Sequence, residues 1–361
     1  LGATGSGIKI ALIDSGLSDP RGEFAGRIDP ASRDIAGDRG LAETDGHGTS
    51  VTAIAGAGRN GTDILGVAFN ATLMVLRTDD PGSCDTDGRC NHNTANIATA
   101  LDIATQNGAR VVNISLGGAP AGTALRAAVA RAAAAGVVIV MAAGNEGAAE
   151  PDDLARIATT PGANGMVIIA GAHDASLAAA SFTNRAGSFG NFYLDALGSD
   201  VRSFDHTGRP FLFTGTSYSA PAIAGAVALL AGLFPNLTGA QIVSLLYASA
   251  IDAGDPGVDA VFGRGILNIG RAVRPIGATS LAGTAVPIAL DRNATLGTAM
   301  GDAALGARLG GAVILDSYAR AYALDLAATL QAAPARRPLT GAIGGNVRSA
   351  ALTADGLALS L

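Results

Sequence analysis

Residues 8–272 alternate between two hydrophobic patterns. Short, nearly continuous apolar runs, typical of strands buried on both faces of a sheet, occupy residues 8–13, 72–76, 111–115, 137–142 and 167–170. Longer stretches with helical spacing, rich in alanine and leucine, occupy residues 49–57, 94–107, 123–135, 220–234 and 239–249. Gly108, Gly136 and Gly147 fall where helices or strands should end. The alternation predicts an α/β fold, with a doubly wound, mostly parallel sheet that carries helices on both faces.

The pattern changes after Pro275. Residues 275–290 are uncharged and rich in Gly, Thr and Ser, which is typical of a hairpin or an extended segment. Apolar residues at helical spacing predict one amphipathic helix over residues 312–333. A Pro-Ala-Arg-Arg-Pro break then precedes two short predicted strands within residues 339–361. We therefore predict a large domain over residues 1–275 and a C-terminal extension over residues 276–361.

Composition and charge exclude several classes of protein. Hydrophobic residues make up 48% of the chain and charged residues 15%, which argues against a disordered chain. The balance of 24 basic against 30 acidic residues, without runs of like charge, argues against nucleic acid as a partner. The apolar part of the longest uncharged stretch, residues 220–234, is shorter than the roughly 20 residues of a membrane-spanning helix. It is therefore predicted to be a buried helix of a soluble protein.

Asp14 is the first residue with candidate chemistry. It ends a predicted strand, at the edge where open α/β sheets place their sites. The structural alternative is an aspartate that forms a turn after the strand.

His47 lies in an Asp-Gly-His-Gly-Thr segment at residues 45–49, directly before a predicted helix. Glycines on both sides let backbone and substrate approach the ring closely, whereas the alternative role is that of a helix cap. His92, His173 and His206 have no such setting and are predicted to lie on the surface. Without a His-Glu-x-x-His pattern, a zinc protease site is not indicated.

Ser217 lies in a Gly-Thr-Ser-Tyr-Ser-Ala-Pro segment at residues 215–221, which opens a predicted helix. The helix dipole there stabilises negative charge, and Pro221 suits a first helical turn. The alternative is that Ser217 is only an N-cap. A structural role is reasonable for any one of these three segments, but a common function explains all three better.

Together the segments supply Asp, His and Ser in that order, and the chain resembles the subtilases, the subtilisin-family serine endopeptidases. The resemblance covers residues 7–272 and includes a fourth family signature, Ala-Ala-Gly-Asn-Glu-Gly at residues 142–147. It implies that Ser217 attacks a peptide carbonyl, that His47 moves the proton and that Asp14 orients His47. It also implies that Asn145 and the Ser217 amide bind the oxyanion, although Asn145 could instead be a left-handed turn residue.

The resemblance also implies a substrate-binding wall. In the family such residues pair with the peptide as an added strand or leave room for a large side chain just N-terminal to the cut. The positions that match are Ser115, Leu116, Gly117, Ala142, Ala143 and Gly144. They favour an apolar or aromatic side chain at that place in the substrate.

Cys84 and Cys90 are the only cysteines, and a local disulfide is favoured over two free thiols. A zinc site that includes His92 would lack a fourth ligand. Four nearby aspartates raise the question of calcium, but they lack EF-hand spacing. The family's usual calcium loop aligns with residues 59–66 and is shortened. We therefore predict no metal and no cofactor, with calcium as the alternative.

Residues 263–268 and 312–318 resemble, more weakly, the subtilases that proteobacteria export as autotransporter passengers. That resemblance implies secretion or display at the cell surface, with a translocator barrel of the Gram-negative outer membrane encoded beyond residue 361. A peptide or protein is the expected substrate, and a propeptide is a further expected partner. The rival hypothesis is a catalytically silent subtilase-fold scaffold. A second alternative is an enzyme of the sedolisin type, but such an enzyme would carry glutamate in place of His47, so His47 argues against it.

Overall fold

The sheet of the first unit is built from the apolar runs that the sequence predicts. The computed structural model describes residues 2–61, 64–85, 90–291, 294–296, 311–325, 330–332, 352–354 and 357–359. Two compact units divide the chain: residues 1–277 with 317–320 form the first, and residues 278–316 with 321–361 form the second. The predicted domain boundary at residue 275 lies next to this division.

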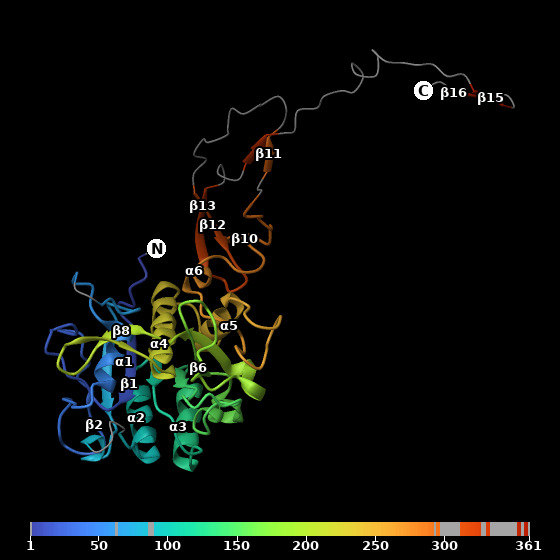
Figure 1. Cartoon of the computed structure of the whole chain (residues 1–361). Coiled ribbons are helices and arrows are strands. Elements are labelled where there is room, and N and C mark those ends of the chain that lie inside the picture. The colour runs from blue at the N-terminus through green and yellow to red at the C-terminus, as the bar shows by residue number, and fades with distance from the viewer. Residues whose placement is uncertain are drawn as a thin grey trace. The chain divides into compact units, whose positions relative to one another are not determined.

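Seven parallel strands form the central sheet of the first unit, in the order β2-β3-β1-β4-β5-β6-β7 (Figure 1). In chain order they are β1 (Lys9–Asp14), β2 (Arg33–Asp34), β3 (Thr72–Arg77), β4 (Val111–Ile114), β5 (Val138–Ala142), β6 (Val167–His173) and β7 (Tyr193–Leu197). A small antiparallel hairpin is formed by β8 (Val201–Phe204) and β9 (Pro210–Phe213). The strand order reverses direction beside β1, which is where open α/β sheets bind their ligands.

Helices cover both faces of this sheet (Figure 1). They are α1 (His47–Gly56), α2 (Thr94–Gln106), α3 (Thr123–Ala134), α4 (Thr216–Leu233), α5 (Gly239–Ser249) and α6 (Ile269–Ala272). Short 3-10 helices are η1 (Ser83–Asp85), η2 (Ala155–Thr159), η3 (Pro161–Ala163) and η4 (Gly187–Phe192). Helices α2 and α3 pack on one face through a continuous buried cluster, whereas α1 and α4 pack on the other. The predicted doubly wound α/β fold is confirmed.

Helix α4 forms the core of its layer. It begins at Thr216, before the predicted start at residue 220, and its polar first turn is buried. By length and composition α4 is apolar enough to cross a membrane, but 83% of that window is buried inside the first unit. Its hydrophobicity is therefore that of a core helix, as the sequence predicts.

The second unit corrects one prediction. Where the structure describes residues 312–333, it shows strands in place of the predicted helix: β12 (Gly311–Leu315) and β13 (Ala321–Asp325) pair antiparallel, with Ile314 opposite Tyr322. The turn between them contains Ala319 at φ 56°, and every second residue of the strands is more exposed. The spacing that suggested a helix therefore came from two strands joined by a turn.

The remaining strands of the second unit are short. They are β10 (Ser280–Leu281), β11 (Ala294–Leu296), β14 (Leu330–Ala332), β15 (Leu352–Ala354) and β16 (Leu357–Leu359). Strands β15 and β16 pair antiparallel within residues 339–361, where the sequence analysis places two short strands. The predicted linker at residues 334–338 lies outside the described residues.

Candidate active site

The three segments singled out in the sequence meet at one edge of the sheet. Asp14 is the last residue of β1, His47 is the first of α1, and Ser217 is the second of α4. His47 and Ser217 line a common cavity of about 800 Å³.

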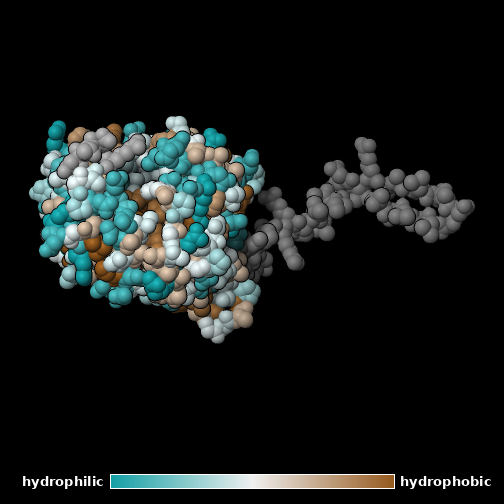
Figure 2. Space-filling view, turned by 90° about the horizontal axis from the view of Figure 1, so that it is seen from below, coloured by the Kyte–Doolittle hydropathy of each residue, from teal (hydrophilic) through white to brown (hydrophobic). Residues whose placement is uncertain are grey.

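Viewed from below Figure 1, the coloured part of the surface is mainly hydrophilic, with apolar residues confined to small patches (Figure 2).

His47 is held against Asp14 by a short hydrogen bond. Its Nδ1 donates to Asp14 Oδ1 at 2.7 Å, and the backbone N–H of Ser15 donates to the same oxygen at 2.8 Å. Asp14 is 1% exposed, whereas the His47 side chain keeps 30% of its surface exposed toward the cavity. Gly48 makes this approach possible, since a Cβ there would lie 2.3 Å from the carbonyl oxygen of Gly16. The aspartate therefore fixes the ring and leaves its other nitrogen available.

Ser217 lies in the first turn of α4 and is not its N-cap, which is Gly215. Its Oγ donates to the carbonyl oxygen of Ser115 at 3.3 Å, and among the described residues no hydrogen bond joins it to His47. Pro221 lies within the helix, so the prediction that it occupies the first turn is wrong. A proline cannot donate to the carbonyl four residues earlier, which is that of Ser217. Ser115 Oγ donates to that carbonyl instead, at 2.8 Å.

Asn145 follows β5 and is oriented by the start of α4. Its Oδ1 accepts hydrogen bonds from Thr216 N at 2.8 Å and from Thr216 Oγ1 at 3.0 Å. The Nδ2 amino group is therefore left to donate elsewhere, and Asn145 lines the same cavity as Ser217. The backbone N–H of Ser217 is one of the first N–H groups of α4, which have no partner inside the helix. These two donors can serve one negatively charged oxygen.

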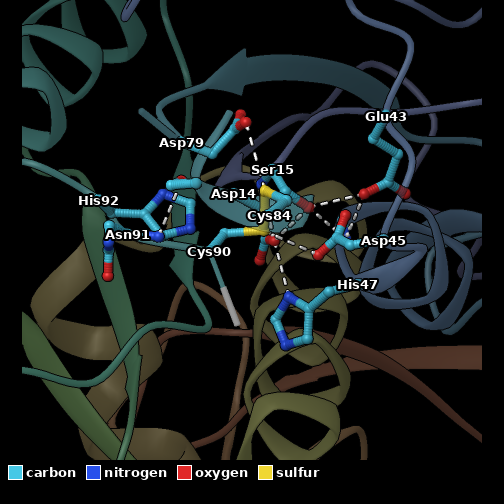
Figure 3. Close-up of a disulfide and its surroundings, with 12 residues drawn as sticks. Asp14, Ser15, Glu43, Asp45, His47, Asp79, Cys84, Cys90, Asn91 and His92 are labelled. Atoms are coloured by element: carbon cyan, nitrogen blue, oxygen red, sulfur yellow. Dashed lines mark hydrogen bonds and ion pairs between the residues drawn. A yellow bond between two sulfur atoms is a disulfide. The ribbon is translucent and has the colours of Figure 1, made fainter. Parts of the chain in front are cut away.

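Two carboxylates that the sequence analysis did not assign to the site, those of Glu43 and Asp45, lie near His47 (Figure 3). Glu43 Oε2 accepts from Ser15 Oγ at 2.6 Å and from Gly48 N at 3.1 Å, and Glu43 also accepts from the Thr49 amide. These bonds tie Glu43 to the start of α1, which carries His47. Burial and then the charge of Asp45 raise the pKa of Glu43 to about 8. The sequence alone did not identify Glu43 as part of the site, because Glu43 lies in a loop outside any recognisable motif.

The electrostatic setting favours the charged form of His47. Burial alone would lower its pKa, but the carboxylates of Asp14, Asp45 and Glu43 outweigh burial and raise it to about 9. The imidazolium that forms when His47 takes a proton is therefore stabilised by its surroundings.

The predicted substrate-binding residues come together with one exception. The cavity is lined by Ser115, Leu116, Gly117, Ala142 and Gly144. Ala143 does not line it, because its side chain points into the core and is 0% exposed. Alternate residues of an extended segment point to opposite faces, so Ala142 and Ala143 cannot share one surface.

The other three histidines are less exposed than the predicted surface positions require. His173 is 7% exposed in β6, and its Nδ1 bonds to the carbonyl oxygen of Asp174 at 2.7 Å. His92 is half-buried, lines the cavity and bonds through Nδ1 to Thr78 Oγ1 at 2.9 Å. Burial lowers the pKa of His92. His206 is half-buried beside Gly46.

Cys84 and Cys90 form a disulfide, as predicted (Figure 3). Cys90 lines the cavity, and its Sγ lies 3.1 Å from Asp45 Oδ2. A disulfide sulfur has no proton to donate, so this approach is a close contact and not a hydrogen bond. Asp45, Cys84 and Cys90 form the one group with metal-site spacing among the described residues, but the two sulfurs are already bonded to each other. The aligned calcium loop includes residues 62–63, which lie outside the described residues.

Another cavity, of about 440 Å³, lies beside α5. Its lining includes Tyr247 and Arg264 but none of the site residues predicted from the sequence. The chemistry-bearing residues thus gather in the cavity at the sheet edge.

Comparison with known proteins agrees with this geometry. The model of the subtilase family matches residues 5–265. Subtilisin DY of Bacillus licheniformis is 30% identical over 273 residues, which cover 76% of this chain and 93% of that protein. Subtilisin E of Bacillus subtilis (strain 168) is 31% identical over 273 residues, covering 76% of this chain and 67% of that protein.

A solved structure described as "Structure of Prenylagaramide maturation protease PagA" superposes with a TM-score of 0.62 at 22% identity. The match covers 74% of this chain and 92% of that one, and it supports the fold alone. The family match and the two subtilisins carry the assignment further: this chain belongs to the subtilase family of serine proteases.

Proposed function

We propose that the protein is an endopeptidase that cleaves peptide bonds through Ser217, His47 and Asp14. The observation that carries the proposal is the hydrogen bond of 2.7 Å between His47 Nδ1 and Asp14 Oδ1, on the wall of the cavity that also exposes Ser217. Membership of the subtilase family supports the same reaction class.

The residues divide the reaction among them. His47 takes the proton of Ser217 as its Oγ attacks the substrate carbonyl, and then gives a proton to the leaving amine. Asp14 holds the His47 ring through Nδ1 and stabilises the imidazolium. Ser217 Oγ donates to the Ser115 carbonyl in this structure, so the reaction requires that it exchange this bond for one to His47.

The developing oxyanion needs donors that are already in place. Asn145 Nδ2 and the Ser217 backbone N–H meet this requirement, because Thr216 holds the oxygen of the Asn145 amide. In subtilisin itself, loss of the asparagine donor lowers turnover about a hundredfold to a thousandfold.

The proposed working environment is outside the cytoplasm. The disulfide between Cys84 and Cys90 supports an oxidising compartment, where such bonds persist. A propeptide and a membrane translocator encoded beyond residue 361 stay predictions from the sequence.

Labelling with a serine-directed fluorophosphonate, followed by peptide mapping, tests the proposal. We expect one modified peptide, containing Ser217, in the native protein and none after heat denaturation. The Ser217→Ala variant should lose labelling and lower casein hydrolysis on the order of a millionfold, as loss of this serine does in subtilisin.

The matched control is Ser219→Ala, on the same helix turn. Ser219 is buried and donates to the carbonyl oxygen of Ala196, away from the cavity. Labelling should survive in this variant. A native protein that is folded yet unlabelled would favour the silent scaffold instead.

A further inference from the structure

Besides Asp45, whose charge acts on His47, the cavity lining contains two carboxylates that the proposed mechanism does not use. Glu146 and Asp152 both belong to its lining, which contains no lysine or arginine among the described residues. Within that described part of the chain, neither carboxylate forms an ion pair. The cation that the described lining can form is therefore the His47 imidazolium, which is held by Asp14, and no lysine or arginine of that lining faces Glu146 or Asp152.

Asp152 lines the cavity beside Gly117 and Gly118. Its Oδ2 accepts from Gly118 N at 3.0 Å, and its backbone N–H donates to the Ala143 carbonyl at 2.7 Å. A Cβ on Gly117 would lie 2.3 Å from Asp152 Oδ2, so the carboxylate rests directly against the Gly117 α-carbon. Gly117 was expected to leave room for a bulky apolar side chain of the substrate. Its missing side chain instead leaves room for the carboxylate of Asp152.

Glu146 approaches Gly144 in the same way. Its Oε2 accepts from Asn145 N at 2.9 Å and from Asn184 Nδ2 at 2.7 Å. A Cβ on Gly144 would lie 2.9 Å from the same oxygen. These neutral donors fix the carboxylate in place without cancelling its charge.

The two carboxylates act on each other. Burial and the neighbouring charge of Glu146 raise the pKa of Asp152, although the hydrogen bond from Gly118 works against this. Like charges that cannot move apart are relieved by a cation placed between them. A guanidinium suits such a place, because its planar donors can bond two carboxylates at once.

The position of His47 indicates which part of the substrate reaches this charge. His47 protonates the leaving amine, so the amine half of the peptide lies toward His47 and the acyl half lies along residues 115–118 and 142–146. We propose that the enzyme prefers arginine or lysine immediately N-terminal to the cleaved bond, bound by Glu146 and Asp152. This rests on the proposed function and replaces the apolar or aromatic preference expected from the sequence.

Matched tetrapeptide p-nitroanilides that differ only in the last residue test this proposal. We expect kcat/KM for arginine to exceed that for phenylalanine about tenfold or more, with glutamate the poorest substrate. In Glu146→Gln and in Asp152→Asn the ratio of arginine to phenylalanine should fall about tenfold. Both substitutions keep the oxygen that accepts the backbone N–H.

Asp153→Asn is the matched control. Asp153 is the exposed neighbour of Asp152, pairs with Arg156 at 2.9 Å and does not line the cavity. In Asp153→Asn the ratio of kcat/KM for arginine to that for phenylalanine should equal the wild-type ratio. The wild-type enzyme alone gives an independent measurement: a peptide aldehyde ending in arginine should inhibit about tenfold more tightly than one ending in phenylalanine.

Three results would overturn the proposal. Fastest cleavage after phenylalanine or leucine would reject it while leaving the endopeptidase function intact. An equal loss toward all substrates in Asp152→Asn and Glu146→Gln would assign both residues to positioning alone. Failure of every substrate together with failure of fluorophosphonate labelling would reject the proposed function as well.

Discussion

His47 is the residue whose surroundings most directly set the activity. Asp14 bonds to its Nδ1, and Asp45 and Glu43 add negative charge nearby, so its pKa rises to about 9 despite burial. In the proposed mechanism His47 must be neutral to accept the Ser217 proton. Activity should therefore increase with pH until this proton is lost.

We predict that kcat/KM for a small ester rises with pH, with its midpoint near pH 9. Asp45→Asn removes one of the charges that hold the proton on His47, so the midpoint should move to lower pH. A pH series on both enzymes measures this. Asp200→Asn, an exposed residue outside the cavity lining, is the control and should keep the wild-type midpoint. A midpoint that stays or rises in Asp45→Asn would contradict the assigned charge effect.

The same pKa shift links stability to pH. The pKa of His47 lies above its ordinary value of 6.5 in the folded protein, so the folded state holds this proton more tightly. The resulting stabilisation is fully present below pH 6.5 and is lost as the pH rises through about 9. The pH that favours the base form of His47 thus removes some of the stability of the fold.

At the scale of elements, the buried parallel strands and their helices could be predicted because they are continuous in the sequence. The strand β2 was missed because it consists of Arg33 and Asp34 alone, and β7 because Asp195 interrupts its apolar run. The helix predicted over residues 312–333 was wrong because apolar residues on two strands joined by a short turn can also be spaced three or four positions apart. Here β12 and β13 pair across such a turn.

The candidate site was predictable only in part, for a related reason. Asp14, His47, Asn145 and Ser217 lie in short motifs that can be read locally. Asp152 becomes part of the site only when its loop packs behind the wall at Gly117. Such positions depend on long-range packing, which no local pattern encodes.

The disulfide segment gives a prediction at this scale. Cys90, Asn91 and His92 all line the cavity, whereas the loop closed by the disulfide is short. Its loss should therefore cost at most about 2 kcal/mol of stability. We expect reduction to raise KM for long peptides a few-fold and to change turnover of a small ester less than about twofold.

Intact-mass measurement with and without reductant establishes the redox state, and a Cys84→Ser/Cys90→Ser variant controls for the reductant. Equal effects on ester and long peptide would contradict a role limited to the rim of the cavity. Two free thiols in the native protein would remove the disulfide and with it the argument for an oxidising compartment.

At the scale of the whole molecule, the first unit is not made of one continuous stretch of chain. Residues 317–320 belong to it although they follow residue 277 by some forty positions. Arg320 is 0% exposed, donates to the carbonyl of Ala272 and, at 2.8 Å, to that of Arg274. Its guanidinium lies 4.8 Å from the centre of the Phe234 ring. The turn therefore completes the packing at the end of α4.

We predict that Arg320→Ala destabilises the first unit by about 2–4 kcal/mol, because it removes the donor to the buried Ala272 carbonyl and the contact with Phe234. For a unit of this size the melting temperature should fall roughly 5–10 °C. The measurement is best made in the Ser217→Ala background, which prevents autolysis. Arg320→Lys should fall in between, since lysine keeps the charge but not the planar fork. Arg33→Ala, at an exposed arginine, should melt within about 1–2 °C of the parent. If Arg320→Ala melted with the parent, residues 317–320 would rest on the first unit without supporting it.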